Sequence, residues 1–401
     1  MKSLRKPSKA ELHNLLTRGV EEIINREHLV KLLNSGKVLR IKLGIDPTSP
    51  DLHLGHSVVL RKLRQFQDLG HKVVLIIGDF TATIGDPSGR SETRKPLTEP
   101  QVKANAREYI EQAGKILDKK DLEVRYNSEW HKREGLESMI ILASSASVQQ
   151  TLRRADFKQR LKSKNDITLL ELLYPIFQGY DSVKVAADVE LGGTDQKFNL
   201  LMGRRVQRFY KMEEQDVMTV PLLEGTDGVK KMSKSLGNYV GFTEGSNEMF
   251  RKIMGVDDRL VTKYFLLCTD VSEKEIKKIE SDMKSGKLNP RDAKLRLARE
   301  IVNIYHGARL AEKAEGEFTK VFSKKELPSK IPQFEMKQPR DIVYVLVKSG
   351  TSHSKSDAWR LIKQGAVTIG NKVVTDPKHQ IHKDCVLQVG KKRFFKISFK
   401  K

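Results

Sequence analysis

The chain has 401 residues and carries 74 Lys and Arg against 51 Asp and Glu, a formal net charge of +23 at pH 7. This length predicts two or three domains with ample core, and the charge favours a polyanionic partner without specifying one. Cys268 and Cys385 are solitary, which excludes a disulfide framework and a cysteine metal site and fits a reducing compartment. We expect no signal peptide and no membrane span.

The first part of the sequence predicts a helix followed by a β-α-β unit. Ser8 and Glu11 have the spacing of a capping box that opens a first helix. Residues 38–45 and 73–77 predict strands, and residues 56–69 predict the helix between them. Because both stretches are largely apolar runs, we expect a parallel sheet buried on both faces.

The rest of the chain predicts helices, one more strand and a separate module. We expect helical segments at residues 101–117, 136–150, 161–180 and 195–207, and the last strand of the sheet at residues 217–220. Helices continue to about residue 322, and residues 327–339 carry three prolines and predict a linker.

The C-terminal residues 340–401 are strongly basic. They contain 14 Lys or Arg and four Asp or Glu, a net charge of +10. Ser354 opens a predicted helix that contains Trp359 and ends at Gly365, and residues 367–374 predict a tight β-hairpin. A basic solubilising tail is the alternative, but the caps and the hairpin favour a folded module.

Two histidines mark the junction between the first strand and the helix that follows it. Residues 53–56 read His-Leu-Gly-His, and imidazoles three residues apart can face one ligand together. Gly55 leaves room for a close approach, and the N-terminal amides of a helix favour an anion. Taken alone, such a pair is more often two ordinary surface histidines near a helix cap.

A second pattern, Lys-Met-Ser-Lys-Ser, occupies residues 231–235 between Gly228 and Gly237. Lysine carries a compact charge on a flexible stem, which suits a moving pyrophosphate. Phosphoryl transfer gathers negative charge on oxygen, so its catalysis is mostly positioning and electrostatics. The histidine pair and the lysine pattern occur together and in this order, which makes a chance match implausible. It also argues against the alternative that the lysines only face solvent.

Three hydrogen-bonding side chains share one face of a predicted helix. Tyr174, Gln178 and Asp181 lie at i, i+4 and i+7 amid apolar neighbours. This arrangement suits a polar ligand, although a helix rim with internally satisfied polar groups would have the same pattern.

The histidine and lysine patterns resemble the two signature loops of class I aminoacyl-tRNA synthetases, which close on ATP from opposite sides. Residues 81–89, 174–181 and 192–196 extend the resemblance to the tyrosyl-tRNA synthetase family over essentially the whole chain. Tryptophanyl relatives share the ATP loops but lack the Tyr/Gln/Asp set and the C-terminal module. The implied fold is α/β, with a Rossmann-like parallel-sheet catalytic domain, an α-helical domain and a small α+β RNA-binding domain.

The resemblance implies an ATP site in which ATP enters with Mg²⁺ as a substrate complex, without a tightly bound cofactor or resident metal. The side chains implied to stabilise the phosphoryl transition state are His53, His56, Lys231 and Lys234. Asp195 would hold the ribose. The implied ATP-binding set is Gly44, Asp46, Thr48, His53, Gly55, His56, Gly192, Asp195, Met232, Ser233 and Lys234.

The resemblance also implies a tyrosine site, in which Asp181 binds the phenol. The other implied residues are Asp86, Tyr174 and Gln178 at the α-amino group, Thr81 nearby, and Gln196 beside the carboxylate. A second phenol partner of the family, a tyrosine, is replaced here by Lys42, whose role the sequence leaves open. Asp181 would then be the main discriminator, because phenylalanine leaves a buried acceptor unpaired.

The C-terminal module resembles the RNA-binding module of the ribosomal protein S-four family. The candidate RNA-binding residues are Lys355, Arg360, Lys363 and Lys372. We expect shape and backbone contacts to dominate, since the surface lacks an aromatic ladder for unstacked bases.

The expected organisation has four parts. Residues 1–225 would form the catalytic domain with an inserted helical dimer and tyrosine-site region, and residues 226–325 the lysine loop and an α-helical anticodon-side domain. A linker, 326–339, would precede the RNA-binding domain, 340–401. The implied reaction activates L-tyrosine with ATP and transfers it to the 3′-terminal adenosine of tRNA(Tyr), in a cytoplasmic homodimer without membrane contact and without a covalent enzyme nucleophile.

Two other functions are considered. Some small-molecule nucleotidyltransferases also use a His-x-Gly-His loop, but they need neither this lysine loop nor an RNA module. An RNA-binding protein with a degenerate catalytic fold is the other, and the intact histidine and lysine pairs argue against such decay.

Overall fold

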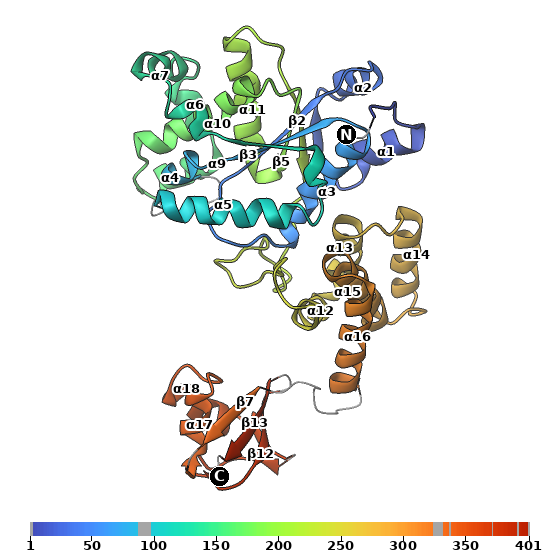
Figure 1. The fold of residues 1–401 in the computed structure, drawn as a ribbon, viewed down its shortest axis with the longest axis vertical. Helices are drawn as coiled ribbons and strands as arrows, with labels where there is room; N and C mark the ends of the chain where they lie inside the picture. The colour runs from blue at the N-terminus through green and yellow to red at the C-terminus, as the bar shows by residue number, and fades with distance from the viewer. Residues whose placement is uncertain are drawn as a thin grey trace. The chain divides into compact units, whose positions relative to one another are not determined.

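The computed structural model describes residues 3–86, 98–323, 332–336, 338–370, 372–390 and 393–399. The chain divides into two compact units, residues 1–311 and 312–401, which are coloured from blue to orange and from orange to red in Figure 1. Within the described ranges, no helix is long and apolar enough to cross a membrane.

A six-stranded sheet forms the centre of the first unit, in the order β1-β6-β5-β2-β3-β4. The strands are β1 (Glu22–Ile24), β2 (Arg40–Ile45), β3 (Lys72–Ile77), β4 (Leu122–Tyr126), β5 (Val189–Gly193) and β6 (Asp216–Val220). Five strands are parallel, and β1 pairs antiparallel with β6 at one edge. The predicted parallel sheet is therefore confirmed, together with the strands at β2, β3 and β6.

Three strands escaped the sequence analysis for identifiable reasons. β1 is only three residues long and half-buried. β4 lies at the other edge, and its charged residues break the apolar run that marks a buried strand. β5 carries a fully buried acidic residue, Glu190, whose partner Lys42 lies on β2, 148 positions earlier in the chain.

Helices flank this sheet (Figure 1). They are α1 (Lys9–Thr17), α2 (Arg26–Asn34), α3 (Leu54–Asp68), α4 (Thr81–Ile84), α5 (Glu99–Ala113), α6 (Ser128–His131), α7 (Leu136–Ala143), α8 (Val148–Thr151), α9 (Ala155–Lys162), α10 (Leu169–Lys184) and α11 (Lys197–Phe209). The capping box at Ser8 and Glu11 is present at the start of α1. The predicted helices near α3, α5 and α11 are confirmed within a few residues.

Two predicted helices are each interrupted. Residues 136–150 form α7 and α8 with a break between them, and residues 161–180 belong to α9 and α10. The second break has a local cause, because Lys164 adopts a left-handed conformation with φ of 56° and Thr168 starts a new helix. Thr168 and Glu171 form a capping box there, which satisfies amides that a continuous helix would bond internally.

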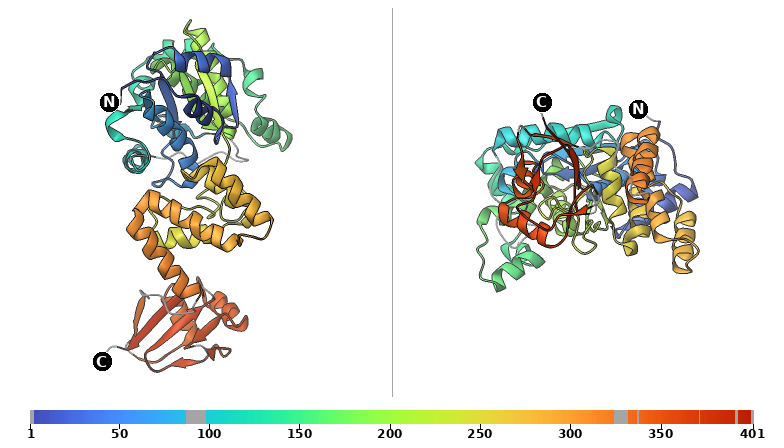
Figure 2. Two further views of the ribbon diagram at one scale, coloured as in Figure 1. Left: turned by 90° about the vertical axis from the view of Figure 1, so that its right-hand side faces the viewer. Right: turned by 90° about the horizontal axis from the view of Figure 1, so that it is seen from below.

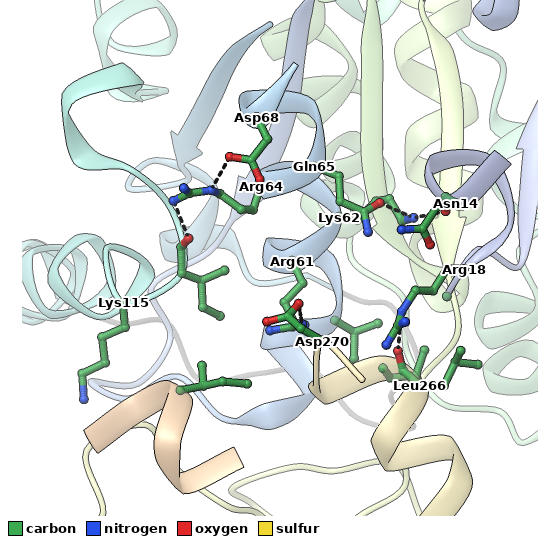
Figure 3. A pocket seen from close by; sticks show the side chains of 15 residues that line it. Asn14, Arg18, Arg61, Lys62, Arg64, Gln65, Asp68, Lys115, Leu266 and Asp270 are labelled. Atoms are coloured by element: carbon green, nitrogen blue, oxygen red, sulfur yellow. Dashed lines mark hydrogen bonds and ion pairs between the residues drawn. The ribbon is translucent and has the colours of Figure 1, made fainter. Parts of the chain in front are cut away.

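A helical region follows the lysine loop, as predicted. It consists of α12 (Ser246–Met254), α13 (Val261–Cys268), α14 (Glu273–Lys284), α15 (Pro290–His306) and α16 (Ala308–Ser323). Arg18, at the end of α1, donates to the carbonyl oxygens of Thr269 at 2.8 Å and Val271 at 2.7 Å, beyond the end of α13. Figure 3 shows this junction beside a cavity of about 470 Å³ between α1, α3 and α13.

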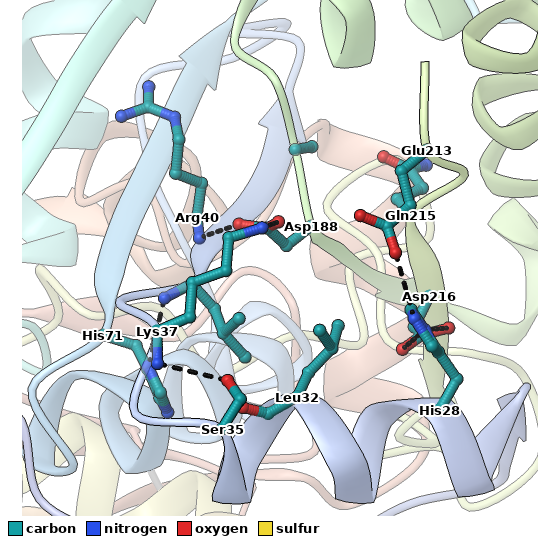
Figure 4. Close-up of polar contacts among 12 residues, drawn as sticks. His28, Leu32, Ser35, Lys37, Arg40, His71, Asp188, Glu213, Gln215 and Asp216 are labelled. Atoms are coloured by element: carbon teal, nitrogen blue, oxygen red, sulfur yellow. Dashed lines mark hydrogen bonds and ion pairs between the residues drawn. The ribbon is translucent and has the colours of Figure 1, made fainter. Parts of the chain in front are cut away.

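Polar side chains join the loops at the starting ends of β2, β5 and β6 (Figure 4). Asp188, just before β5, accepts from Lys37 Nζ at 2.6 Å and from the Arg40 amide at 2.7 Å. His28 contacts the buried Asp216 at the start of β6, at 3.0 Å. These contacts cover the amino ends of the strands and leave their carboxyl ends for a ligand.

Beyond the part of α16 that belongs to it, the second unit contains the helices α17 (Ile342–Lys348) and α18 (Lys355–Lys363). They lie beside a β-sheet (Figure 2). The five-stranded sheet has the order β10-β9-β12-β13-β7. Its strands are β7 (Gln333–Met336), β9 (Val367–Ile369), β10 (Lys372–Val373), β12 (Cys385–Val389) and β13 (Arg393–Phe399), and a separate pair is formed by β8 (Arg340–Asp341) and β11 (Gln380–Ile381). The predicted capped helix and hairpin correspond to α18 and to β9 with β10, while Asn371 lies outside the described residues.

One structural difference concerns the predicted linker, residues 326–339. Residues 333–336 of this segment form β7, which pairs parallel with β13 and places Phe334 opposite Ile397. Met336 is buried in the core of the unit, so hydrophobic packing draws part of the proline-containing segment into the sheet. Residues 326–331 and 337 lie outside the described residues, as do residues 87–89 of the motif at 81–89.

Candidate active site

A cavity of about 910 Å³ opens at the carboxyl ends of the central strands. Between β5 and β2 the chain reverses the direction in which successive strands are added, and such switch points bind ligands in open α/β sheets. Every residue expected to take part in catalysis or in binding ATP and tyrosine lines this cavity. They are Gly44, Asp46, Thr48, His53, Gly55, His56, Thr81, Asp86, Tyr174, Gln178, Asp181, Gly192, Asp195, Gln196, Lys231, Met232, Ser233 and Lys234.

The histidine pair lies at the start of α3. The two ring centroids are 3.9 Å apart, and the amide of His53 donates to Nδ1 of His56 at 3.2 Å. The segment is anchored from the other side of the lysine loop, because the amide of Leu54 donates to the carbonyl oxygen of Val240 at 3.0 Å. Gly55 avoids a tight contact here, since a Cβ would lie 3.0 Å from the ring of His53.

Burial makes both imidazoles neutral. It lowers the pKa of His53 far below its ordinary value and, with a contribution from Lys234, lowers the pKa of His56 to about 4. Because Nδ1 of His56 accepts a hydrogen bond, the proton of its neutral ring lies on Nε2. Within the described residues, Nδ1 of His53 is buried without a partner. The pair therefore offers neutral polar groups to a ligand.

The lysine loop supplies the positive charge. Nζ of Lys231 lies 2.8 Å from Oδ2 of Asp195, and Nζ of Lys234 donates to Oγ of Ser49 at 2.8 Å and to the carbonyl oxygen of Asp51. Partial burial lowers the pKa of Lys234 to about 8. The ammonium group of Lys234 is therefore largely charged at pH 7.

Asn238 holds this loop in shape. Its Oδ1 accepts from the amide of Ser233 at 2.8 Å, and its Nδ2 donates to Asp227 at 2.9 Å. Asn238 also fills the space beside Gly225, where a Cβ would lie 2.3 Å from its side chain. Neither Asn238 nor Ser49 was predicted as a site residue. The signal for Asn238 is its position just after the lysine pattern in the sequence, whereas Ser49 is recognised only by its contact with Lys234 in the fold.

Asp46 is expected to bind ATP, and it contacts two residues that are expected to bind tyrosine. Its Oδ1 accepts from Thr81 Oγ1 at 2.7 Å, and its Oδ2 accepts from the Tyr174 hydroxyl at 2.8 Å. Loss of hydration, with a contribution from the neighbouring Asp86 and Asp181, raises the pKa of Asp46 to about 7. A Cβ at Gly78 would collide with Asp46, so a glycine is needed behind this carboxyl group.

Asp181 lies at the deep end of the cavity and is buried. Its Oδ1 accepts from Trp130 Nε1 at 2.9 Å and from His131 Nε2 at 3.0 Å, and its Oδ2 accepts from Asn127 Nδ2 at 3.3 Å. None of these three donors was expected from the sequence. They follow β4 directly, and the carboxyl ends of parallel strands face the ligand site in such sheets. They could have been predicted from this position, but the sequence did not predict β4.

The remaining tyrosine-site residues form a second small network. Gln196 Nε2 donates to Asp86 Oδ2 at 2.9 Å, and Asn199 Nδ2 donates to Gln196 Oε1 at 2.9 Å. Gln178 is buried on α10, on the face shared by Tyr174 and Asp181. The i, i+4, i+7 spacing thus brings these three side chains to one cavity.

Lys42 is fully buried and points into the contact between α10 and β5. Its Nζ donates to the carbonyl oxygen of Gln178 at 3.0 Å and to Oγ of Ser182 at 2.7 Å, and it pairs with Glu190 at 2.8 Å. Its neighbours Leu43 and Gly44 line the cavity. Lys42 is therefore a structural cation behind the tyrosine end.

The candidate RNA-binding residues lie on the surface of the second unit. Lys355, Arg360 and Lys363 belong to α18, Lys372 belongs to β10, and all four are exposed. Trp359 lies between the α18 cations and is 43 % exposed. The structure thus adds one exposed aromatic side chain to a basic helix.

Two family models match the chain in succession. Residues 34–323 match the class I tRNA synthetases for tryptophan and tyrosine (W and Y), and residues 324–397 match the SYY-like C-terminal domain of tyrosine–tRNA ligase. Together they cover most of the sequence.

Full-length relatives and solved structures agree with this match. The chain is 52 % identical to tyrosine–tRNA ligase of Thermotoga maritima and 50 % identical to that of Idiomarina loihiensis, with 96 % of each chain covered in both pairs. In fold, it is similar to a C-terminally truncated mitochondrial tyrosyl-tRNA synthetase of Aspergillus nidulans (TM-score 0.66, 23 % identity, 79 % of this chain and 95 % of that one). It is also similar to the tyrosyl-tRNA synthetase of Archaeoglobus fulgidus solved with L-tyrosine (TM-score 0.63, 21 % identity, 77 % and 99 % covered). The chain belongs to the tyrosine–tRNA ligase family of class I tRNA synthetases.

Proposed function

We propose that the chain activates L-tyrosine with ATP to tyrosyl-adenylate and pyrophosphate, and then transfers tyrosine to the 3′-terminal adenosine of tRNA(Tyr). The observation that carries this proposal is the single cavity that unites the two histidines, the two lysines and Asp181. A phosphoryl-transfer set at one end and a hydroxyl acceptor at the other fit an amino acid with a phenol beside a nucleotide.

In the first step, the tyrosine carboxylate attacks the α-phosphorus of ATP, and pyrophosphate leaves with the bonding electrons. The substrates supply both nucleophile and leaving group, so the side chains act by position and charge. His53 and His56 offer neutral polar groups to the phosphoryl oxygens, and Lys231 and Lys234 offer cations. ATP enters with Mg²⁺ as its own counterion, and no resident metal or tightly bound cofactor takes part.

Binding of ATP would exchange existing partners for substrate groups. Lys231 and Asp195 now neutralise each other at 2.8 Å, both partly exposed. The ribose hydroxyls can take over Asp195 while the phosphates take over Lys231. Such an exposed pair costs little to separate, because surface ion pairs contribute roughly 0–1 kcal/mol.

Tyrosine would lie along α10 with its phenol at Asp181. Tyr174, Gln178 and Asp86 would then surround the α-amino group, with Thr81 nearby and Gln196 beside the carboxylate; all five residues line the cavity. The remaining residues expected to bind ATP, from Gly44 to Lys234, line the same cavity and would hold the nucleotide. Buried hydrogen-bonding groups that a wrong amino acid leaves unpaired provide the selection.

The basic C-terminal module would bind tRNA(Tyr). Its exposed cations Lys355, Arg360, Lys363 and Lys372 suit phosphate oxygens, and Trp359 offers one stacking surface among them. We retain a catalytic part to residue 225 and a helical part to 325, and we extend the proposed RNA-binding part to include β7, because β7 pairs with β13 and Met336 is buried in the core of that unit.

A homodimer is supported by an exposed apolar surface within the proposed dimer region. The residues of this surface are Leu136, Ile140, Ile141, Val148, Leu161, Leu169 and Leu170, with exposed fractions from 44 % to 78 %. Exposed apolar side chains are this frequent where a helical region packs against a partner, since a large exposed apolar patch marks an interaction site. A second copy of the chain, in the cytoplasm where tRNA is charged, is the proposed partner. Sedimentation of Leu136→Glu/Ile140→Glu should then show monomers.

Amino-acid-dependent ATP–pyrophosphate exchange, measured against all twenty amino acids, tests the activation step. We expect exchange with tyrosine alone at physiological concentrations. A nucleotidyltransferase of another kind would show no dependence on amino acid, and an inactive RNA-binding relative would show no exchange at all.

Removal of residues 340–401 tests the RNA proposal. Pyrophosphate exchange should remain nearly intact, because the residues that line the cavity lie within residues 43–236. Charging of tRNA should fall steeply, most of all at low salt, and its remaining dependence on salt should be weaker than in the full-length chain, because the phosphate contacts of the module are lost. Charging that survives truncation at moderate salt would show that the module is not a tRNA anchor. Loss of pyrophosphate exchange as well would place it in the catalytic fold.

A further inference from the structure

The two oxygens of Asp181 have different surroundings. Oδ1 accepts two short hydrogen bonds, from Trp130 at 2.9 Å and from His131 at 3.0 Å, whereas Oδ2 accepts one longer bond from Asn127 at 3.3 Å. A carboxylate oxygen can accept two hydrogen bonds. Among the described residues, Oδ2 is therefore the oxygen with capacity left for a hydroxyl in the cavity that Asp181 lines.

His131 is fixed in place by aromatic side chains. Its ring lies stacked on Phe80 at 4.9 Å between centroids and meets Phe177 edge-on at 5.3 Å and Tyr180 at 5.9 Å. Only 1 % of the His131 side chain is exposed. A ring packed in this way cannot rotate freely, so Nε2 remains directed at Asp181.

Lys42 cannot act as a second partner of the phenol. Its ammonium group is buried and already contacts Gln178, Ser182 and Glu190. Removal of this cation from Glu190 would leave a buried charge unpaired, which is costly. Lys42 therefore gives no second contact to the hydroxyl, and its selection depends on the orientation of Asp181.

We propose that His131 is a positioning residue for tyrosine specificity. Its Nε2–H donates to Oδ1 of Asp181, fixes the plane of the carboxylate and presents Oδ2 to the phenol hydroxyl. This inference rests on the proposed function. In it, His131 contributes to specificity through Asp181 and does not contact the substrate itself. Phenylalanine gains nothing from the orientation, because it has no hydroxyl to donate.

The test compares three variants in tyrosine- and phenylalanine-dependent pyrophosphate exchange with the full-length chain. His131→Phe keeps an aromatic ring but removes the donor. We expect it to lower the ratio of kcat/KM for tyrosine over phenylalanine roughly 10-fold to 100-fold, mainly through a higher KM for tyrosine, the size of a hydrogen bond to a charged group. His131→Gln places an amide nitrogen near the position of Nε2 and should restore the ratio to within about threefold of the parent.

His131→Asn tests the same hydrogen bond if His131→Phe does not fold. Its amide is too short to reach Asp181, so the ratio should fall in this variant and survive in His131→Gln. The matched control is His71→Gln, at a histidine buried at the start of β3, where Nδ1 accepts from the Leu39 amide at 3.3 Å. This control should leave the ratio unchanged, whatever it does to stability.

Two results would overturn the proposal. One is an unchanged ratio in folded His131→Phe or His131→Asn, and the other is a ratio in His131→Gln as low as in His131→Asn. Failure of the proposed function is a separate outcome, because the parent protein itself would then show no tyrosine-dependent exchange.

Discussion

The proposed ATP end and the proposed tyrosine end of the cavity are built in opposite ways. At the ATP end, Lys231 and Lys234 hold small polar partners that a substrate can replace, and one of the pairs is half-exposed. At the tyrosine end, Asp181 and Lys42 are buried and bonded to other protein groups. A site for a highly charged substrate that comes and goes keeps exchangeable charges, whereas a site that selects one hydroxyl needs polar groups fixed by the protein.

The largest effect expected from this contrast concerns Lys42. Lys42→Met leaves Glu190 charged and buried, which should lower the free energy of unfolding by about 3–5 kcal/mol. Denaturant unfolding of the isolated variant measures this loss. The double variant Lys42→Met/Glu190→Gln should recover most of it, and equal instability of the single and double variants would contradict the role of the pair.

The next effect concerns catalysis at the ATP end. Replacement of His56 or Lys234 by alanine should slow tyrosyl-adenylate formation roughly 10²–10³-fold and leave the dissociation constant of tyrosine nearly unchanged. Rapid-quench kinetics and equilibrium dialysis measure the two quantities. Lys230→Ala is the matched control, because Lys230 is exposed and lies next to the loop residues that line the cavity. Equal losses in binding and rate would make His56 and Lys234 ground-state ligands or structural supports.

The smallest effect is a dependence on pH. The pKa of Lys234 is lowered to about 8, so its ammonium form dominates below pH 8 and is lost above it. The rate of adenylate formation should therefore decline about tenfold per pH unit above pH 8, up to the limit set by loss of that charge. Lys234→Arg, whose charge persists, should remove the decline. A decline that stays in this variant would belong to another group.

The same contrast decides how much the sequence could predict. The ATP end consists of short contiguous patterns, residues 53–56 and 231–235, so spacing and residue type alone bring it to notice. The i, i+4, i+7 face of α10 was readable for the same reason, because helical periodicity is local. Each of these predictions uses a relation within eight residues of the chain.

The support of the tyrosine end could not be predicted in this way. Asn127, Trp130 and His131 act through Asp181, about 50 positions later in the chain, and the strand that leads to them is a half-buried edge strand with charged residues. The partner of Lys42 is 148 positions away. Burial of charge depends on pairing between distant segments, which local periodicity does not encode.

One measurement tests the division between the two ends most directly. It is the steady-state rate of tyrosine- and phenylalanine-dependent pyrophosphate exchange in His56→Ala and in Asp181→Ala, made side by side. We predict that His56→Ala lowers the rate of exchange with tyrosine and with phenylalanine by the same factor and leaves the ratio of their kcat/KM values unchanged. Asp181→Ala should lower the ratio at least 10-fold, through poorer use of tyrosine. A changed ratio in His56→Ala, or an unchanged ratio in Asp181→Ala, would contradict the division.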